Sequence, residues 1–501
     1  MPPQPIQRQR PLNCHISELP YASCNVDLFS HFADQNWALF LDSCVDLGAS
    51  GQYDIIAFEP FIQVQARGQQ TLVTYPRSDR GSKTTCHTRN FYDVLKEQLQ
   101  PFEEIVTTLL ESAQLPSDLP FYGGAIGHFN YDLNNDLNND LNTRINSELN
   151  IDPSQPELAT TFDANIGVYD CFIVVDHAKK KTFFIDLGFA DSPRNENPMQ
   201  SLLNQPQDNT APELPLFKLT QDFRLDSSAT HYQRQYQRII DYIYAGDCYQ
   251  VNFAQRLSSV FTGHLWNAYK ALRSASPAPY SAFMVLPDTT LLSHSPESFL
   301  SVEDQQVITC PIKGTRRRSN DPAEDQLLQT ELRESAKDQA ENLMIVDLMR
   351  NDLGRHCRTG SVAVNQLFEL KSFSNVHHLV SSIQGQLKPN SHPLDLLKDS
   401  FPGGSITGAP KRRAMEIIDE LEPYQRGPYC GSLGYISFDG RMNTSIAIRT
   451  LYSEEGNLYC WGGGGIVADS NCSDEYCESQ DKINNLIQTL NNLQQLSEPK
   501  K

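Results

Sequence analysis

Apolar and polar residues alternate with two different periods along this 501-residue chain. Four short runs rich in β-branched and aromatic residues predict strands at 37–41, 54–57, 71–75 and 172–176. The segment 90–100 instead spaces its apolar residues three or four apart, which predicts a helix that Pro101 ends or kinks. The first part of the chain is therefore expected to mix strands with short helices.

The pattern changes at 191–226, a stretch rich in Pro, Asn, Gln and Asp that predicts a linker or long loop. Beyond it we expect a helix over 231–245, then strands alternating with glycine-rich turns, and a last helix with an apolar stripe. A chain of this length exceeds one ordinary core. We therefore expect an N-terminal domain over 1–190 and an α+β domain that carries the chemistry over 227–490.

The formal net charge of −20 disfavours binding to nucleic acid or to anionic membranes. An anionic substrate would need cations or a metal ion placed locally in its site. No apolar run is long enough to span a membrane, the first residues lack the apolar stretch of a signal peptide, and the 12 cysteines form no CxxC pair. These features predict a soluble cytoplasmic protein without a zinc site or a disulfide framework.

A low-complexity repeat with a period of four occupies 132–142 and begins like a calcium-binding loop. Leu137 stands where such a loop requires Gly, and Thr143 stands where it requires Glu. We therefore expect a loop insertion here and no calcium site.

Two ionisable residues flank a β-hairpin predicted over 299–312. Glu297 precedes its first strand and Lys313 follows its second, which places both near the same end of the hairpin. A carboxyl group and an amine at that position can act as general acid and nucleophile. The three arginines at 316–318 would disfavour the charged form of the amine. The alternative is a solvated lysine beside an exposed glutamate.

Glu341 lies on the apolar stripe of a helix predicted over 331–350, because three apolar residues follow it at helical spacing. A buried carboxylate requires a partner, and a divalent cation would serve. The alternative is a structural salt bridge with one of three nearby arginines: Arg333, Arg350 or Arg355.

Glycines and small hydroxyl residues at 401–409 lead into Pro410, a residue suited to a first helical turn. Free backbone N–H groups at such a helix start, together with the Thr407 hydroxyl, can hold an anion. A nucleotide phosphate loop would need Lys-Ser/Thr after the second glycine, where Ala409 and Pro410 stand. A small anion such as a carboxylate therefore fits better than ATP, and an ordinary capped helix start is the alternative.

Three further groups of residues are candidates for a site. Arg449 ends an apolar strand and can clamp a carboxylate with two hydrogen bonds, although a sheet-edge ion pair is the alternative. Glu475 and Glu478 are neighbours on the first turns of the last helix, where acids are commonly only dipole complements. His377 and His378 would point to opposite faces of a strand, so that one of them can reach a site.

Taken together, these segments resemble the chorismate-utilising enzymes, a family that includes the anthranilate, aminodeoxychorismate, isochorismate and salicylate synthases. The likeness covers most of 230–485 and is carried by AENLMIVDLMRNDLGR at 340–355 and GGSITGAPK at 403–411. The N-terminal part is similar to the family's accessory domain in LPYASC, QNWALFLDS and FYGGAIGHFNYDL. The resemblance implies an α+β fold like that of anthranilate synthase component I, with large, mostly antiparallel sheets packed in a sandwich and helices outside.

One position separates the chemistries of this family. The aminodeoxychorismate branch carries PIKGT and the anthranilate branch usually has Ala at the Lys position, which is Lys313 here. The resemblance thus implies a transferase that makes 4-amino-4-deoxychorismate, a precursor of 4-aminobenzoate and folate. Lys313 would attack ring C2, Glu297 would protonate the departing 4-hydroxyl, and ammonia would then attack C4. Anthranilate synthase component I is the alternative, and the joint presence of these groups argues against a catalytically inactive metabolite-binding regulator.

The resemblance also implies ligands and a partner. Mg²⁺ would be held through Glu341 and Glu478, with Glu475 close by. Substrate contacts would fall on His378, Thr407, Tyr429, Arg449, Gly465 and Lys482. Ammonia would come from glutamine through a separate glutaminase subunit, since the chain shows no glutaminase signature. Some subunits similar to this one hold bound tryptophan, and the matching positions are Ser43, Ser50, Tyr53, Pro279, Tyr280 and Ser281.

Overall fold

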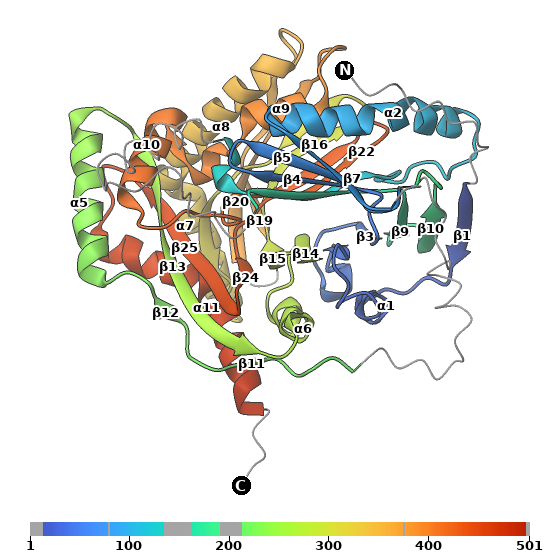
Figure 1. Ribbon diagram of the computed structural model, residues 1–501. Coiled ribbons are helices and arrows are strands. Elements are labelled where there is room, and N and C mark those ends of the chain that lie inside the picture. The colour runs from blue at the N-terminus through green and yellow to red at the C-terminus, as the bar shows by residue number, and fades with distance from the viewer. Residues whose placement is uncertain (1–13, 79–80, 135–161, 191–212, 374–375, 497–501) are drawn as a thin grey trace, which may run out of the picture.

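The computed structural model describes residues 14–78, 81–134, 162–190, 213–373 and 376–496 (Figure 1). Two large antiparallel sheets pack face to face, and helices cover the outer side of each sheet (Figure 1). This arrangement confirms the expected α+β sandwich. Most of the predicted linker, at 191–212, and the repeat from residue 135 onward lie outside the described residues.

The first sheet contains 13 strands within the described ranges. In spatial order they are β1 (His15–Leu19), β10 (Lys181–Asp186), β9 (Cys171–Asp176), β3 (Tyr53–Ala57), β2 (Leu39–Asp42), β14 (Tyr280–Val285), β15 (Thr290–Ser295), β24 (Thr450–Glu454), β25 (Asn457–Ile466), β13 (Gln250–Thr262) and β11 (Lys218–Leu219). Two short strands, β12 (Arg224–Leu225) and β21 (Gly408–Ala409), also pair with β13.

The second sheet contains 12 strands in the same part of the chain. In spatial order they are β18 (Ile312–Arg317), β20 (Val376–Gln386), β17 (Gln306–Thr309), β16 (Ser298–Glu303), β23 (Met442–Ile446), β22 (Ser432–Ser437), β7 (Gly124–Phe129), β8 (Ala164–Tyr169), β4 (Ile62–Arg67), β5 (Gln70–Tyr75) and β6 (Lys83–His87). One more strand, β19 (Ala363–Ser372), pairs with β20.

The central strands of the first sheet are apolar on both faces, and β9 shows why. Phe172 and Val174 belong to the core shared with the second sheet, whereas Cys171, Ile173 and Val175 belong to the core under the outer helices. A strand that is covered on both sides needs no polar face. This is why β9 reads as a continuous apolar run in the sequence.

The helices form three groups. The outer side of the first sheet is covered by α1 (Val26–Ser30), α6 (Leu265–Ala275) and α11 (Cys472–Leu496) (Figure 1). Over the second sheet lie α2 (Phe91–Glu111), α7 (Pro322–Glu334), α8 (Ala336–His356) and α9 (Pro393–Ser400), while α5 (Ala229–Ala245) and α10 (Lys411–Leu421) pack beside β13. Three 3₁₀ turns complete the set: η1 (Val45–Leu47), η2 (Tyr131–Asn134) and η3 (Gly404–Ile406). No helix among the described residues is both long and apolar enough to cross a bilayer.

Two helix predictions need correction. Pro101 does not end α2, which continues to Glu111 because Phe102, Val106 and Leu109 extend the buried stripe and their packing outweighs one lost hydrogen bond. The helix predicted over 331–350 is two helices, because Ser335 separates α7 from α8. Its side chain caps α8 by accepting a hydrogen bond from the Asp338 amide at 3.3 Å.

Each sheet takes strands from both sides of the predicted linker. In the first sheet β2 pairs with β14, and in the second β7 pairs with β22. The residues before 190 therefore complete the sheets on which the later segments depend, and share their core. The boundaries at 190 and 226 stay a prediction, and β11 and β12 lie within the end of the predicted linker.

Candidate active site

A cavity of about 550 Å³, here called the large cavity, is bounded by both sheets and by α8 and α11. Strand β25 of the first sheet and strands β18 and β20 of the second contribute to its wall. Most of the predicted catalytic, metal-binding and substrate-binding residues line it: Glu297, Lys313, Glu341, His378, Tyr429, Arg449, Gly465, Glu475, Glu478 and Lys482. Segments far apart in the sequence thus bring their polar groups to one place.

Glu297 lies directly before β16, and its side chain is buried with 5% exposed surface. The Glu297 backbone is fixed on both sides, since its amide donates to Ser295 Oγ at 3.2 Å and its carbonyl accepts from Ile446 at 3.1 Å. Burial raises the pKa of Glu297, and the hydrogen bond with Ser405 and the charge of Lys313 offset only part of this effect. A carboxyl group with a raised pKa keeps its proton more readily and can act as a general acid. The alternative of an exposed glutamate does not apply.

Lys313 lies on β18, opposite Leu379 of β20, where the register of the two strands shifts. The next residue, Gly314, has φ +80°, and a Cβ there would lie 2.9 Å from Leu332 Cδ1. Glycine is therefore required at this irregularity. Such irregularities commonly redirect a neighbouring side chain, and Lys313 lines the same cavity as Glu297.

The three arginines after Lys313 do not act as free charges beside it. Their guanidinium groups form ion pairs with carboxylates: Arg316 with Glu331 and Asp338, Arg317 with Glu324, and Arg318 with Asp325. The carboxylates offset the cations. The effect of this arginine run on the Lys313 amine stays a prediction.

Three carboxylates face the large cavity from two helices. Glu341 comes from α8, and Glu475 and Glu478 come from α11. Lys337 Nζ lies 4.0 Å from Glu341 Oε1 and 3.6 Å from Glu475 Oε1. In the described part of the chain no ion pair joins Glu341 to Arg333, Arg350 or Arg355, the partners that the structural alternative required.

These acids differ in their electrostatic setting. Burial raises the pKa of Glu341, with Lys313 and Lys337 acting in the opposite direction. Burial also acts to raise the pKa of Glu478, but the adjacent Lys482, 2.7 Å away, and Lys313 outweigh it, so that this pKa is lowered. Of Glu341 and Glu478, Glu478 is therefore more easily kept as a carboxylate, the form that binds cations.

The carboxylate set fits Mg²⁺ as a partly hydrated ion. Across the described ranges no three His, Cys, Asp or Glu side chains are grouped closely enough to enclose a metal by themselves. Mg²⁺ needs no such cage, because it keeps several waters and commonly uses one or two carboxylates together with an anionic substrate. A Cβ on Gly464 would lie 3.2 Å from Glu475 Oε2 and 3.6 Å from Glu478 Oε1. Glycine therefore keeps space open beside these oxygens.

Two polar groups in the wall are without protein partners within the described residues. Arg449 has φ +50° between β23 and β24 and forms no ion pair there, so the predicted alternative of a sheet-edge pair is not found. The Nε2 atom of His378 is buried and unpaired, while its Nδ1 lies 2.9 Å from Thr315 Oγ1. Burial and the nearby charge of Arg449 lower the pKa of His378 to about 4, so its ring is neutral at pH 7. Both groups are placed to meet an anionic ligand.

Thr407 and the start of α10 are arranged differently from the prediction. Thr407 does not belong to the lining of the large cavity, and its hydroxyl donates to the Gly403 carbonyl at 3.0 Å. Pro410 is the N-cap residue, and α10 begins at Lys411, whose Nζ lies 2.7 Å from Asp352 Oδ2. A direct substrate contact by Thr407 stays a prediction. His377 points away from His378 and contacts Asp325 at 3.0 Å, as the strand geometry predicts.

Sequence reasoning missed Asn252, which lines the large cavity with 6% of its surface exposed. Its Nδ2 atom is buried without a partner, although its backbone is held at both ends. A buried amide without a partner is costly and indicates a missing ligand or water. The available signal was a polar residue between the apolar Val251 and Phe253 in β13. The aromatic wall was also missed in part: Tyr429 stacks on Trp461 at 5.5 Å between ring centroids.

A second cavity of about 310 Å³, here called the small cavity, lies between β2, β3 and β14 of the first sheet and β22 and β23 of the second. Every residue predicted to contact tryptophan lines it: Ser43, Ser50, Tyr53, Pro279, Tyr280 and Ser281. The geometry thus brings this set together. The identity of an occupant stays a prediction.

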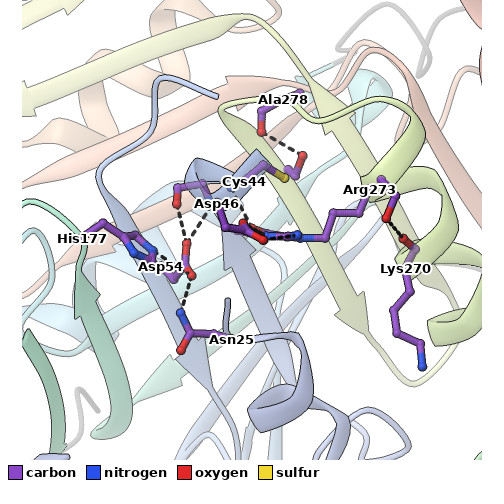
Figure 2. A network of polar contacts seen from close by, with 12 residues as sticks. Asn25, Cys44, Asp46, Asp54, His177, Lys270, Arg273 and Ala278 are labelled. Carbon is purple, nitrogen blue, oxygen red and sulfur yellow. Dashed lines mark hydrogen bonds and ion pairs between the residues drawn. The ribbon is translucent and has the colours of Figure 1, made fainter. Parts of the chain in front are cut away.

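A buried ionic network supports the small cavity (Figure 2). Asp42 accepts hydrogen bonds from Arg273 Nε at 2.6 Å and from the Tyr269 hydroxyl at 2.9 Å. Arg273 also forms an ion pair with Asp46. Next to it, Asp54 accepts from Asn25 at 2.7 Å and from the Ser43 hydroxyl at 2.6 Å. His177 lies 3.0 Å from Asp54, so the network fixes the segment that carries Ser43.

Residues 48–488 match the family of chorismate binding enzymes, and the chain belongs to that family. It is 41% identical to aminodeoxychorismate synthase component 1 of Klebsiella aerogenes over 92% of this chain and 95% of that protein. Anthranilate synthase component 1 of Acetivibrio thermocellus is 32% identical, over 93% and 92% of the two chains. The crystal structure of anthranilate synthase component I from Streptococcus pneumoniae matches with a TM-score of 0.70 and 31% identity, covering 88% of this chain and 93% of that one.

Proposed function

We propose that the protein is component 1 of an aminodeoxychorismate synthase, which converts chorismate and ammonia into 4-amino-4-deoxychorismate. The observation that carries this proposal is Lys313, an amine in the wall of the large cavity together with the buried acid Glu297. Relatives of that name in Klebsiella aerogenes, Salmonella typhimurium and Escherichia coli match the chain at 40–41% identity. Anthranilate synthases of Acetivibrio thermocellus, Thermus thermophilus and Bacillus subtilis match at 32–36% identity.

The proposed reaction uses two side chains. The Lys313 amine, which reacts in its unprotonated form, makes a bond to ring C2, both ring double bonds shift by one position toward C4, and the 4-hydroxyl departs as water with a proton from Glu297. Ammonia then forms a bond to C4, both double bonds shift back to their original positions, and the C2–lysine bond breaks, which returns the electron pair to the Lys313 nitrogen. The raised pKa of Glu297 supports its role as a proton donor, since burial favours the protonated carboxyl group.

The charged groups of the large cavity suit a substrate with two carboxylates. We propose that Arg449 and His378 contact one carboxylate, and that Glu341 and Glu478 hold Mg²⁺ against the other, with Glu475 close by. When bound, the ion would supply positive charge that offsets the repulsion between the substrate and these acids. The unpaired Nε2 of His378 and the lack of an ion pair at Arg449 in the described chain support this assignment.

Three further proposals concern the setting of the reaction. Ammonia would come from glutamine through a glutaminase partner, which accords with the name component 1 of the relatives. The small cavity would hold L-tryptophan, because it combines apolar walls with the polar groups that an amino acid requires. The cytoplasm would be the compartment, which the free state of all cysteines supports.

The test of the proposed function is the product formed from chorismate, Mg²⁺ and ammonium by the purified protein. We expect 4-amino-4-deoxychorismate, which becomes 4-aminobenzoate only after a lyase is added. Direct formation of fluorescent anthranilate would reject the proposal in favour of anthranilate synthase. Calorimetric titration tests the small cavity separately: L-tryptophan should bind, and its failure to release heat at millimolar concentration would reject that ligand.

A further inference from the structure

A buried ion pair lies directly behind the wall of the large cavity. Arg426 and Glu422 follow α10, and their side chains expose 1% and 2% of their surface. Arg426 Nε and Nη2 donate to the two oxygens of Glu422 at 2.8 and 2.7 Å, a two-pronged pairing. Neither residue lines the cavity. Direct contact with a bound ligand therefore does not explain why these charges are buried here.

The remaining contacts of this pair reach the cavity wall. Arg426 Nη2 donates to the Asn252 carbonyl at 2.6 Å, and Nη1 donates to the Ile406 carbonyl at 2.9 Å. Glu422 Oε1 also accepts from the Ala254 amide at 2.8 Å. The Arg426 guanidinium lies 5.9 Å from the ring centroid of Tyr429. One planar group thus connects β13, η3 and the aromatic wall.

These contacts bear on groups that face a ligand. Asn252, Ile406 and Tyr429 line the cavity, and Asn252 presents its unpaired Nδ2 there. Ile406 follows Ser405, whose side chain hydrogen-bonds to Glu297. A buried ion pair gives weak stability compared with apolar packing, but the rigid fork of an arginine fixes several acceptors in one geometry.

We infer that Arg426 and Glu422 are a positioning pair, which holds Asn252, Ile406 and Tyr429 in the arrangement that binds chorismate. The inference rests on the proposed function for the identity of the ligand. It assigns these two residues no contact with the substrate. The guanidinium is essential because lysine can supply the charge but cannot bond to Glu422 and two carbonyls in one plane.

The test compares Arg426→Lys with Arg256→Lys in the full-length protein, using chorismate, Mg²⁺ and ammonium. Arg256 is a matched control because it lies on β13 beyond Asn252, pairs with Asp226 at 2.7 Å and stacks on Tyr424, yet does not line the cavity. We expect the KM for chorismate to rise about tenfold or more in Arg426→Lys, the effect of about 1.4 kcal/mol of lost binding, and to stay at the parent value in Arg256→Lys.

The KM separates positioning from a purely structural role. Partial unfolding lowers the active fraction and therefore the apparent kcat, but leaves the KM of the folded molecules unchanged. An unchanged KM in Arg426→Lys would overturn the inference. If this variant does not fold, Glu422→Gln, which keeps the size and one acceptor oxygen, should raise the KM, and an unchanged KM there would overturn it equally. A parent protein without activity on chorismate would instead reject the proposed function.

Discussion

Both cavities lie between the two sheets, but they differ in whether their polar groups have hydrogen-bond or ion-pair partners in the protein. Of the described residues that line the small cavity, Asp42 alone is charged, and it is paired with Arg273 and hydrogen-bonded to Tyr269. The large cavity contains many charges and leaves Arg449, His378 Nε2 and Asn252 Nδ2 without protein partners in the described chain. Polar groups that satisfy one another fix a shape, whereas groups left unpaired are available to a ligand.

The largest expected effect is on stability and comes from the small cavity. Arg273→Met should lower the free energy of unfolding by about 3–5 kcal/mol, because it leaves the buried carboxylate of Asp42 without its cation. Urea unfolding monitored by circular dichroism measures this loss. The matched variant Arg89→Met, which removes a solvent-exposed pair with Glu97, should leave the free energy of unfolding close to that of the parent. If Arg273→Met and Arg89→Met lost the same free energy of unfolding, the claim that the network around Asp42 determines the local structure would be wrong.

The next effect is on catalysis and comes from the large cavity. Lys313→Ala should reduce the formation of 4-amino-4-deoxychorismate by about 10²-fold or more, the expected consequence of removing a nucleophile. The ammonium-dependent rate, followed by chromatography, measures this change. Lys371→Ala on β19, which like β18 pairs with β20, is the control, since Lys371 pairs with Glu369 and does not line the cavity. Parent-like turnover by Lys313→Ala would remove the covalent step from the account.

A smaller effect, on the KM for chorismate, is expected from changing Arg449, whose guanidinium lacks a protein partner in the described chain. Arg449→Lys should raise the KM for chorismate about 10-fold or more, because charge-assisted hydrogen bonds contribute about 1.5–3 kcal/mol each. Steady-state kinetics against chorismate measure the change. The control is Arg441→Lys, which lies in the β22–β23 turn and pairs with Asp439. A KM equal to that of the parent would show that Arg449 does not contact the substrate.

The smallest effect is a pH dependence of stability in the small-cavity network. The hydrogen bond and charge of Asp54 raise the pKa of His177, although burial opposes them, and His177 and Ser43 lower the pKa of Asp54 against its own burial. A histidine whose pKa is raised on folding stabilises the fold, and this stabilisation is fully present below the unfolded pKa of about 6.5. It is lost as the pH rises through the pKa of the folded state. An aspartate whose pKa is lowered on folding stabilises the fold above its unfolded pKa of about 3.9. This stabilisation is lost as the pH falls through the pKa of the folded state. The pair therefore contributes most between these two values.

The corresponding measurement is the difference in Tm between the parent and His177→Gln. This difference should be largest near pH 6 and should shrink as the pH rises and His177 loses its proton in the parent. A difference that stays constant into the alkaline range would show that the charge of His177 does not stabilise the network.

Much of the large cavity could be predicted from the sequence because its groups belong to short local motifs. Glu297 and Lys313 flank one hairpin, and Glu475, Glu478 and Lys482 share the first turns of α11. Local spacing places the members of each group side by side, whereas their assignment to one site came from the resemblance to the chorismate-utilising enzymes. Asn252 could not be found in this way, because its position depends on the pairing of β13 with β25, which sets it opposite Gly465.

The fold shows the same division between local and long-range information. Strand and helix periods located β9, β5 and α5 closely, but they did not reveal that Ser335 separates α7 from α8. The proline rule predicted that Pro101 would end or kink the helix, whereas tertiary packing of the apolar stripe continues α2 to Glu111. The sharing of each sheet between the N-terminal and C-terminal strands is likewise a tertiary property, which no local pattern encodes.

The central claim is that Lys313 bonds to the substrate. The most direct measurement is mass spectrometry of the protein quenched during incubation with chorismate and Mg²⁺ without ammonia. The account predicts an increase equal to chorismate less one water, located on the peptide that contains Lys313 and removed by a chase of ammonium. An adduct on any other side chain, or ammonium-dependent turnover at the parent rate after Lys313→Ala, would contradict it.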